Sequence, residues 1–342
     1  MNDKVNARVP AAYKVDDQEL LLGFYKKALW NRIVPRIPAS IAPNTITVVG
    51  QAMALLAVVA AYLATTGAPI FYLVSAALIL GYLTADNVDG PHARRTGQAS
   101  PLGEFLDHGL DGLASGSLLL ITGIIMRADA IPMVLLGVLG AVGFIVVFWE
   151  QYRTGLLVIP RVSSTEGATL IMLIELALFF AQDPTWLHFS MNEFNLATAF
   201  ILAALVGYSA AMAPPIVRAA QAGAKPLELV PLFAIAGSYA VYPAMGGAPI
   251  IPAMAVGVFG ADIVCRMIVM RHQGRDGRLW SRMHLLAAVP LVGAIAAPNA
   301  WTVTGWSTLT LIITVALYAR TMHRGIAEMI ARHSKTRAHA IG

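Results

Sequence analysis

Four aspartates lie in two closely spaced pairs in the first third of the chain, and these residues are the best suited to chemistry. Asp86 and Asp89 are three residues apart and Asp107 and Asp111 are four apart, so on helices each pair shares one face. Two such pairs on consecutive antiparallel helices can converge on one point. The alternative is a solvated loop with acidic helix ends. Converging carboxylates require a cation between them, and oxygen ligands suit Mg²⁺ or Mn²⁺ rather than zinc.

The segment between the two pairs contains small residues and a histidine. Gly90, Ala93 and Gly97 would let a flat ligand approach the backbone closely, although the same residues could instead serve tight packing of helices. We expect His92 to lie on an exposed loop as a solvated side chain.

The composition shows which elements must position these residues. Of 342 residues, 57% are hydrophobic and 13% are charged, about half the charged fraction of soluble domains, so a water-soluble globular enzyme is excluded. The apolar stretches are unbroken and about 20 residues long, which indicates transmembrane helices. We therefore predict an all-α polytopic membrane protein with about ten transmembrane helices and no removable signal. The ten predicted spans are 46–66, 69–89, 104–126, 131–152, 166–182, 195–215, 228–245, 250–271, 281–298 and 303–321.

The distribution of basic residues orients the chain. With ten spans, every Lys and Arg except Arg127 falls on the side that contains both termini and the aspartates. The positive-inside rule places that side in the cytoplasm. The single cysteine, Cys265, excludes an intramolecular disulfide and a cysteine-based zinc site.

The segment before the first span combines apolar and basic residues. This pattern predicts an amphipathic helix on an anionic membrane surface, with a plain topological anchor as the alternative. The apolar residues are Leu20, Leu21, Phe24, Tyr25, Ala28, Leu29 and Ile33, and the basic ones are Lys26, Lys27, Arg32 and Arg36.

The spacing around the aspartates resembles the signature of the CDP-alcohol phosphotransferase family. The matching positions are Asp86-x2-Asp89-Gly90-x2-Ala93-Arg94-x8-Gly103-x3-Asp107-x3-Asp111. The segments 93–96, 100–104 and 107–109, together with 42–47 and 148–155, look most like the choline/ethanolamine phosphotransferase branch. Pro91-His92 departs from that branch, whose members usually carry Lys-Gln there.

The resemblance implies a specific reaction. A phospho-amino-alcohol, phosphocholine or phosphoethanolamine, passes from CDP-choline or CDP-ethanolamine to the hydroxyl of diacylglycerol, which releases CMP and forms a phospholipid. By this resemblance, Asp86, Asp89, Asp107 and Asp111 hold Mg²⁺, with Mn²⁺ as a substitute. Four carboxylates and a diphosphate carry about −6 together, which favours two ions over one. The residues expected around the cytidine and diphosphate are Asn44, Gly90, Ala93 and Arg94.

The acceptor hydroxyl must lose a proton, and His108 is the candidate base. An imidazole exchanges protons near neutral pH, and the branch resemblance gives the histidine after the third aspartate this role. In other branches the fourth aspartate is favoured, which makes Asp111 the second candidate. The alternative for His108 is a helix-capping role.

Aromatic and acidic residues at the ends of the fourth and fifth spans suit an ammonium headgroup. We expect Glu150, Tyr152 and Glu166 to bind it, with Trp149 nearby; an interfacial aromatic belt is the alternative. Deeper residues also carry charge: Glu175 lies inside the fifth span, and Asp262 is expected to form an ion pair with Arg266 at i,i+4.

The predicted organisation has four segments: 1–45, with the amphipathic helix; 46–185, the catalytic helices; 186–322, additional helices; and 323–342, a basic tail. A homodimer is expected from the resemblance, with membrane lipids but no nucleic acid as partners. The expected location is the inner membrane of a bacterium, or the endoplasmic reticulum or Golgi of a eukaryote. Two alternatives stay open: a related enzyme that acts on inositol, glycerol phosphate or serine, and an ion-coupled membrane transporter.

Overall fold

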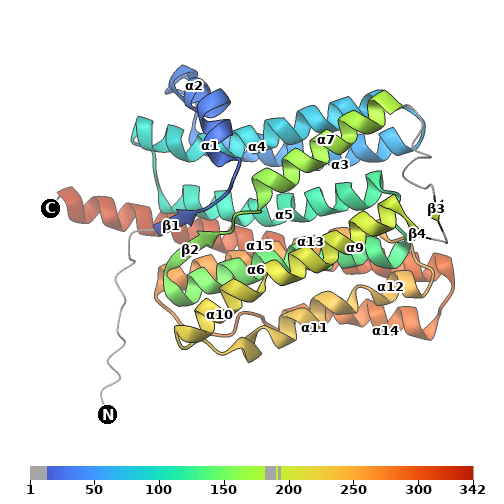
Figure 1. Cartoon of the computed structure of the whole chain (residues 1–342). Coiled ribbons are helices and arrows are strands. Elements are labelled where there is room, and N and C mark those ends of the chain that lie inside the picture. The colour runs from blue at the N-terminus through green and yellow to red at the C-terminus, as the bar shows by residue number, and fades with distance from the viewer. Residues whose placement is uncertain (1–13, 182–189, 192–193, 342) are drawn as a thin grey trace, which may run out of the picture.

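The computed structural model describes residues 14–181, 190–191 and 194–341, and its long helices run side by side in one bundle (Figure 1). The first half of the chain contributes α3 (Pro43–Thr65), α4 (Ile70–Thr96), α5 (Pro101–Ile125), α6 (Ala130–Thr154) and α7 (Ser164–Ala181). The second half contributes α9 (Leu196–Ala211), α10 (Ala213–Gln221), α11 (Val230–Ser238), α12 (Val241–Ala244), α13 (Ile250–Gln273), α14 (Val289–Ala296) and α15 (Ala300–Ile341).

The described residues contain nine helical stretches long and apolar enough to cross a membrane, which confirms the prediction of an all-α polytopic membrane protein. Two stretches are composite: α9 continues into α10, and the 3-10 turn η3 (Pro226–Glu228) continues into α11 and α12. The predicted span 281–298 is instead a shorter apolar helix, Arg282–Ala296. Its first part, η4 (Arg282–Ala288), is a 3-10 helix, which rises about 2.0 Å per residue and so covers more length than an α-helix of equal residue count.

Helices α5 and α13 form the centre of the bundle. Each is 72% buried over its most apolar stretch, against 17% for the α9–α10 stretch. Small residues let these two backbones approach closely: a Cβ atom at Gly112 would lie 2.8 Å from the Cα of Ala261. A Cβ atom at Gly109 or Gly116 would similarly lie close to Cys265 or Gly257. One face of α5 therefore packs directly on α13.

The N-terminal segment folds back over the connection between α6 and α7. Strand β1 (Lys14–Asp17) pairs in parallel with β2 (Leu156–Ile159), and a second small pair joins β3 (Ser190–Met191) to β4 (Phe194–Asn195). Glu19 accepts hydrogen bonds from the Thr165 backbone N–H (2.9 Å) and hydroxyl (2.7 Å), at the first turn of α7. Burial raises the pKa of the Glu19 carboxyl, because the charged form loses its hydration.

The predicted amphipathic helix is not confirmed as one continuous element. Residues 22–36 form consecutive short turns: α1 (Leu22–Tyr25), the π-helical η1 (Lys26–Trp30), α2 (Asn31–Ile33) and η2 (Val34–Arg36). Trp30 is buried and stacks on Tyr25 with ring centroids 5.3 Å apart, whereas Leu20 and Phe24 are about two-thirds exposed. The contact of this segment with a membrane surface stays a prediction.

Three parts of the chain lie at the same end of the bundle. The α4–α5 connection, strand β1 and the last turns of α15 all lie there (Figure 1). The core is continuous from α3 to α15, because buried residues of α13 pack against those of α5 and α6. The four predicted segment boundaries stay predictions.

Candidate active site

Two helix ends position the aspartates. Helix α4 continues beyond its predicted limit, through Pro91 to Thr96, and ends at Gly97, whose φ of +68° is a left-handed conformation that suits glycine. The Ser100 hydroxyl then caps α5 by accepting a hydrogen bond from the backbone N–H of Gly103 (3.1 Å). Because only residues 97–100 separate the two helices, both aspartate pairs remain at the same end of the bundle.

Three of the four aspartates come together. One carboxylate oxygen from each of Asp86, Asp107 and Asp111 lies within 4.8 Å of the others. No Lys or Arg of the described residues forms an ion pair with any of the three. Converging oxygen ligands without a basic partner fit a hard divalent cation such as Mg²⁺, which would neutralise their mutual repulsion.

The fourth aspartate, Asp89, is buried beside this cluster rather than inside it. Its carboxylate accepts hydrogen bonds from the Thr47 hydroxyl of α3 and from the backbone N–H of Gly90 (2.5 Å). Three of the four carboxylates that were predicted to converge therefore do so. The Asp89 carboxylate is instead oriented by the hydroxyl of Thr47 on α3.

His108 lies next to the carboxylate cluster and is 8% exposed. Its Nε2 is 3.8 Å from a carboxylate oxygen of Asp107, and its ring packs edge-on against Phe148 at 5.1 Å between centroids. The imidazole is therefore held between the acidic cluster of α4 and α5 and an aromatic side chain of α6.

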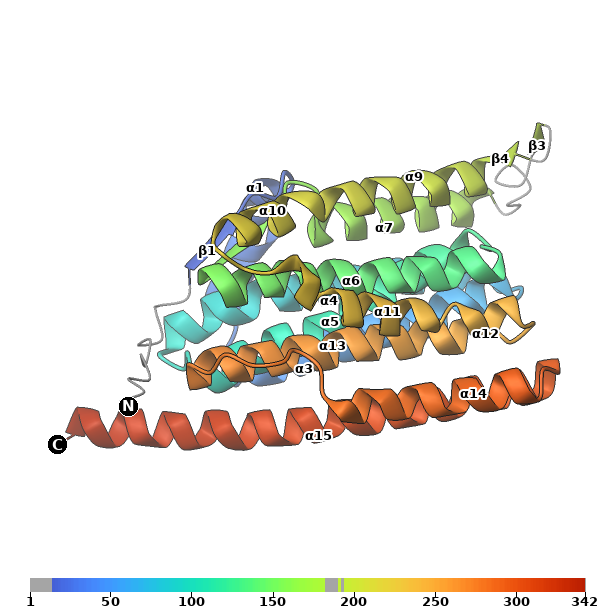
Figure 2. The same ribbon diagram turned by 90° about the horizontal axis from the view of Figure 1, so that it is seen from below.

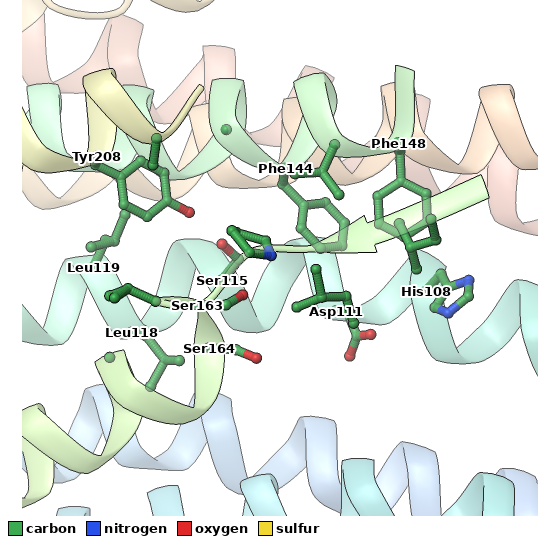
Figure 3. Close-up of a pocket in the computed structure, with 18 of the residues that line it drawn as sticks. His108, Asp111, Ser115, Leu118, Leu119, Phe144, Phe148, Ser163, Ser164 and Tyr208 are labelled. Atoms are coloured by element: carbon green, nitrogen blue, oxygen red, sulfur yellow. The ribbon is translucent and has the colours of Figure 1, made fainter. Parts of the chain in front are cut away.

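A cavity of about 300 Å³ connects the cluster to an apolar space between α5, α6, α7 and α9 (Figure 3). Its acidic end contains Asp86, Asp107, His108 and Asp111. Its apolar part is lined by side chains that include Leu118, Leu119, Phe144, Val147, Phe148, Ile171 and Met212. Hydroxyl groups of Ser115, Ser163, Ser164 and Tyr208 interrupt the apolar wall (Figure 3). One cavity thus offers a place for a charged group and a place for a hydrocarbon chain.

The residues expected around a nucleotide lie at the ends of α3 and α4. The guanidinium of Arg94 lies over Gly90, where an added Cβ would be 3.5 Å from Nη1 and would meet no other helix within 4 Å. Gly90 therefore does not serve tight helix packing, and its face is open. Asn44, near the start of α3, approaches Gly103 of α5, and Ala93 is half-buried on α4.

The expectation for His92 is wrong. Because α4 continues through this position, the side chain is fully buried rather than solvated on a loop. Its Nε2 lies 2.9 Å from the carbonyl oxygen of Ile41 and its Nδ1 lies 3.0 Å from Nη2 of Arg95. His92 thus ties α4 to the segment before α3.

The residues predicted to bind the headgroup have other partners. Glu150 is buried and forms a two-point ion pair with Arg218, with Nη2 and Oε2 2.9 Å apart. The Tyr152 hydroxyl donates to the Arg275 carbonyl oxygen (2.9 Å), and Glu166 accepts from the backbone N–H groups of Leu21 (2.8 Å) and Ser163 (2.9 Å). Glu150 and Tyr152 lie near the end of α6 and Glu166 lies in the first turn of α7, on either side of the connection between these helices. Their role toward a headgroup stays a prediction.

Two deeper carboxylates differ in their environment. Glu175 of α7 is fully buried, and neither oxygen has a hydrogen-bond partner among the described residues. Asp262 of α13 pairs with Nε2 of His284 (2.5 Å) instead of with Arg266, whose Nε donates to the carbonyl oxygen of Leu279 (3.1 Å). The expected Asp262–Arg266 pair is therefore replaced, because η4 brings His284 against α13.

Several cavity residues were missed from the sequence. Tyr82 precedes Asp86 by four residues and Ser115 follows Asp111 by four, so helical spacing could have identified both. Phe144, Phe148 and Tyr208 come from α6 and α9, and no spacing in the sequence connects them to the aspartates.

Comparisons with known proteins agree with this geometry. A sequence profile described as CDP-alcohol phosphatidyltransferase matches residues 40–213, just over half of the chain. Cholinephosphotransferase 1 of Gallus gallus is 31% identical over 173 residues, 48% of this chain and 52% of the relative. The Xenopus laevis protein of the same name is 36% identical over 144 residues, 40% of this chain and 36% of the relative.

A third relative, from Dictyostelium discoideum, is described as an uncharacterized CDP-alcohol phosphatidyltransferase class-I family protein 2. It is 33% identical over 184 residues, 52% of this chain and 45% of the relative. The chain spans about half the length, or less, of these curated relatives. The aspartates, the cavity beside them and the matched region coincide on α3–α9, and the chain belongs to the CDP-alcohol phosphatidyltransferase family.

Proposed function

We propose that this protein transfers phosphocholine or phosphoethanolamine from a CDP-alcohol to the hydroxyl of diacylglycerol, with release of CMP. One observation carries the proposal: a single cavity joins the carboxylate cluster to an apolar space. A water-soluble acceptor such as inositol, glycerol phosphate or serine needs no such apolar wall. The similarity to cholinephosphotransferase 1 supports the choice of donor.

The aspartates are proposed to hold the metal. Asp86, Asp107 and Asp111 would bind one Mg²⁺ or Mn²⁺, and Asp89 would share a second ion with them. When bound, the ions would neutralise charge on the diphosphate and polarise the bond that breaks. Thr47 and the Gly90 N–H would keep the Asp89 carboxylate in place. Asn44, Gly90, Ala93 and Arg94 would contact the cytidine and diphosphate, with Arg94 supplying a charged hydrogen bond.

His108 is proposed as the base that accepts the proton of the diacylglycerol hydroxyl. It lines the cavity where the acidic end meets the apolar wall, and Phe148 and Asp107 restrict the orientation of its ring. The acyl chains would lie along Leu118, Leu119 and Phe144, which brings the hydroxyl toward the imidazole. Asp111 lines the same end of the cavity and is the second candidate.

The headgroup and the assembly are further parts of the proposal. Glu150, Tyr152 and Glu166 would contact the amino alcohol, which requires that at least one of their present hydrogen bonds is exchanged. Both termini and the active site would face the cytoplasm, and the protein would act as a homodimer. The location would be the endoplasmic reticulum or Golgi in a eukaryote, or the inner membrane in a bacterium.

The experiment that tests the function uses purified protein in detergent micelles. CDP-choline and CDP-ethanolamine compete for transfer to diacylglycerol, while CMP and the labelled phospholipid are both quantified. Equal amounts of CMP and phospholipid would support the proposal, and the preferred donor would identify the headgroup. Absence of both products, together with substrate movement across sealed vesicles, would favour an ion-coupled transporter instead.

A further inference from the structure

A second cavity, of about 290 Å³, lies between α13, η4 and α15, and its charge is opposite to that of the first. Three arginines line it: Arg266 of α13, and Arg320 and Arg324 of α15. Arg320 and Arg324 are one helical turn apart, so both guanidinium groups reach the same face of α15. We call this space the basic cavity.

The arginines of the basic cavity have no carboxylate partner among the described residues. Arg266 uses only its Nε, which donates to the carbonyl oxygen of Leu279, and no described carboxylate forms an ion pair with Arg320 or Arg324. Asp262 also lines the cavity, but one of its oxygens is bound by His284. Three cations against one carboxylate leave an excess of positive charge.

Some other arginines of the same bundle form ion pairs with carboxylates. Arg153 contacts Glu228 and Asp276, Arg218 contacts Glu150, and Arg271 contacts Glu104. None of the three arginines that line the basic cavity has such an ion pair with a described carboxylate.

We propose that the basic cavity binds the phosphate group of an anionic lipid. Guanidinium groups match phosphate oxygens in pairs, and three of them around one space can neutralise a phosphate monoester or diester. The second oxygen of Asp262, Oδ1, is buried and has no hydrogen-bond partner among the described residues. It would accept a hydrogen bond from a donor on the ligand, such as the hydroxyl of a protonated phosphate.

The surroundings of the basic cavity favour a lipid over free phosphate. Val269, Met270, Met283 and Leu317 are the apolar residues of its lining. The exposed side chains of Leu285, Leu286 and Val289 continue the apolar surface from η4 into α14. Helices α14 and α15 lie side by side next to it (Figure 2). Acyl chains could therefore extend along apolar surface while the phosphate stays among the arginines.

The test measures thermal unfolding of the purified full-length chain in detergent with three probes: dihexanoylphosphatidate, inorganic phosphate and dihexanoylglycerol. The last probe has the same acyl chains without the phosphate. EDTA is present throughout, so the aspartate cluster carries no ion and repels phosphate. Ligand that binds only the folded state raises the unfolding midpoint, and the titration gives an apparent Kd.

Phosphatidate should raise the midpoint. Dihexanoylglycerol is itself a diacylglycerol and fits the acceptor space of the first cavity, so any shift that it causes should be the same in wild type and in Arg320→Gln/Arg324→Gln. In the variant Arg320→Gln/Arg324→Gln the apparent Kd for phosphatidate should increase at least about tenfold, because charged hydrogen bonds are lost. The matched control Arg275→Gln/Arg278→Gln removes two exposed arginines from the neighbouring α13–η4 connection and should leave the Kd unchanged. Arg324→Lys keeps the charge without the paired geometry and should give an intermediate Kd.

Each other outcome is decisive. If inorganic phosphate protects as well as phosphatidate and the same arginines are required, the site takes phosphate and the lipid chains are irrelevant. If phosphatidate gives no protection, or protects the cavity variant and the control equally, the proposal is wrong. These results are independent of turnover, so they do not depend on the function proposed above.

Discussion

The two cavities lie on different sides of the central helices and carry opposite charge. In the first, α4 and α5 contribute carboxylates that form no ion pair with a described Lys or Arg. In the second, α13 and α15 contribute guanidinium groups that form no ion pair with a described carboxylate, although Asp262 lies in the same lining. Helix α5 contacts elements of both cavities. Its aspartates face the first cavity, and the carbonyl oxygen of Gly109 accepts a hydrogen bond from the hydroxyl of Tyr318 on α15, a helix that lines the second (3.1 Å).

The comparison shows how unpaired charge indicates the ligand. Partly buried charges that lack a partner in the protein are costly, so the acidic cluster is expected to bind a cation. In the basic cavity Arg266 is half-buried and Arg320 and Arg324 are exposed, so an anion is expected there because three like charges line one space. We therefore expect a cation in the acidic cavity and an anion in the basic cavity. If the acidic cavity holds a cation, loss of its charged groups should affect turnover and nucleotide binding, whereas a change at the α5–α13 contact between the cavities should affect stability alone.

The largest effect is expected from removal of a carboxylate in the acidic cluster. Asp86→Ala or Asp107→Ala should abolish turnover, because the remaining oxygens no longer hold the ion that neutralises the diphosphate. Turnover of the detergent-purified variants is measured with Mg²⁺ and after EDTA. Asp129→Ala, an exposed aspartate at the start of α6, is the matched control and should remain active. Loss of folding in both cluster variants, without a selective loss of activity, would indicate a structural polar cluster.

The next largest effect is expected from loss of the base that accepts the proton of the acceptor hydroxyl. His108→Ala should lower turnover by about 10²–10⁴ while binding of CDP-alcohol and metal is preserved, since the carboxylates and Arg94 remain. Asp111→Asn should instead weaken metal dependence and nucleotide binding together. Single-turnover rates and equilibrium binding separate these outcomes. If His108→Ala stays active and Asp111→Asn loses only the rate, then Asp111 is the base.

A smaller effect is expected from the cation beside the diphosphate. Arg94→Ala should increase the Kd for CDP-alcohol roughly tenfold to a hundredfold, because one charged hydrogen bond is lost. Arg95→Ala is the control on the same helix, since its guanidinium is bonded to the Ile37 carbonyl oxygen and to His92. Equal affinities of wild type and Arg94→Ala, with a reduced rate alone, would contradict a binding role.

The smallest effect is expected at the packing contact between α5 and α13, the two central helices that lie between the cavities. Gly112→Ala would place a Cβ atom 2.8 Å from the Cα of Ala261, so α5 and α13 must separate, at a cost of about 1–3 kcal/mol in the free energy of unfolding. Gly207→Ala on α9 meets nothing within 4 Å and should be neutral or stabilising by up to about 1 kcal/mol. Thermal unfolding of both variants checks this difference, and equal midpoints would show that the close contact is not needed.

The sequence by itself determined the class of fold and the chemistry of the cluster. Long apolar runs identify membrane helices whatever their arrangement, because lipid offers no hydrogen bonds to an open backbone. Likewise, the i,i+3 and i,i+4 spacings identified which carboxylates share a helix face. The same spacing argument could identify Tyr82 and Ser115 as cavity residues, because each lies one helical turn from an aspartate, Asp86 or Asp111, on the same helix face.

Only the tertiary structure decided which distant residues meet. The sequence does not predict the burial of His92, because α4 continues through Pro91 and the partner of the imidazole, the Ile41 carbonyl oxygen, lies about fifty residues earlier in the chain. Asp262 pairs with His284 rather than Arg266 because η4 packs on α13, and the apolar wall of the first cavity requires α6 and α9 beside α5. Helical periodicity specifies the face of a single helix, whereas the packing of one helix on another depends on side-chain shape across segments far apart in the chain.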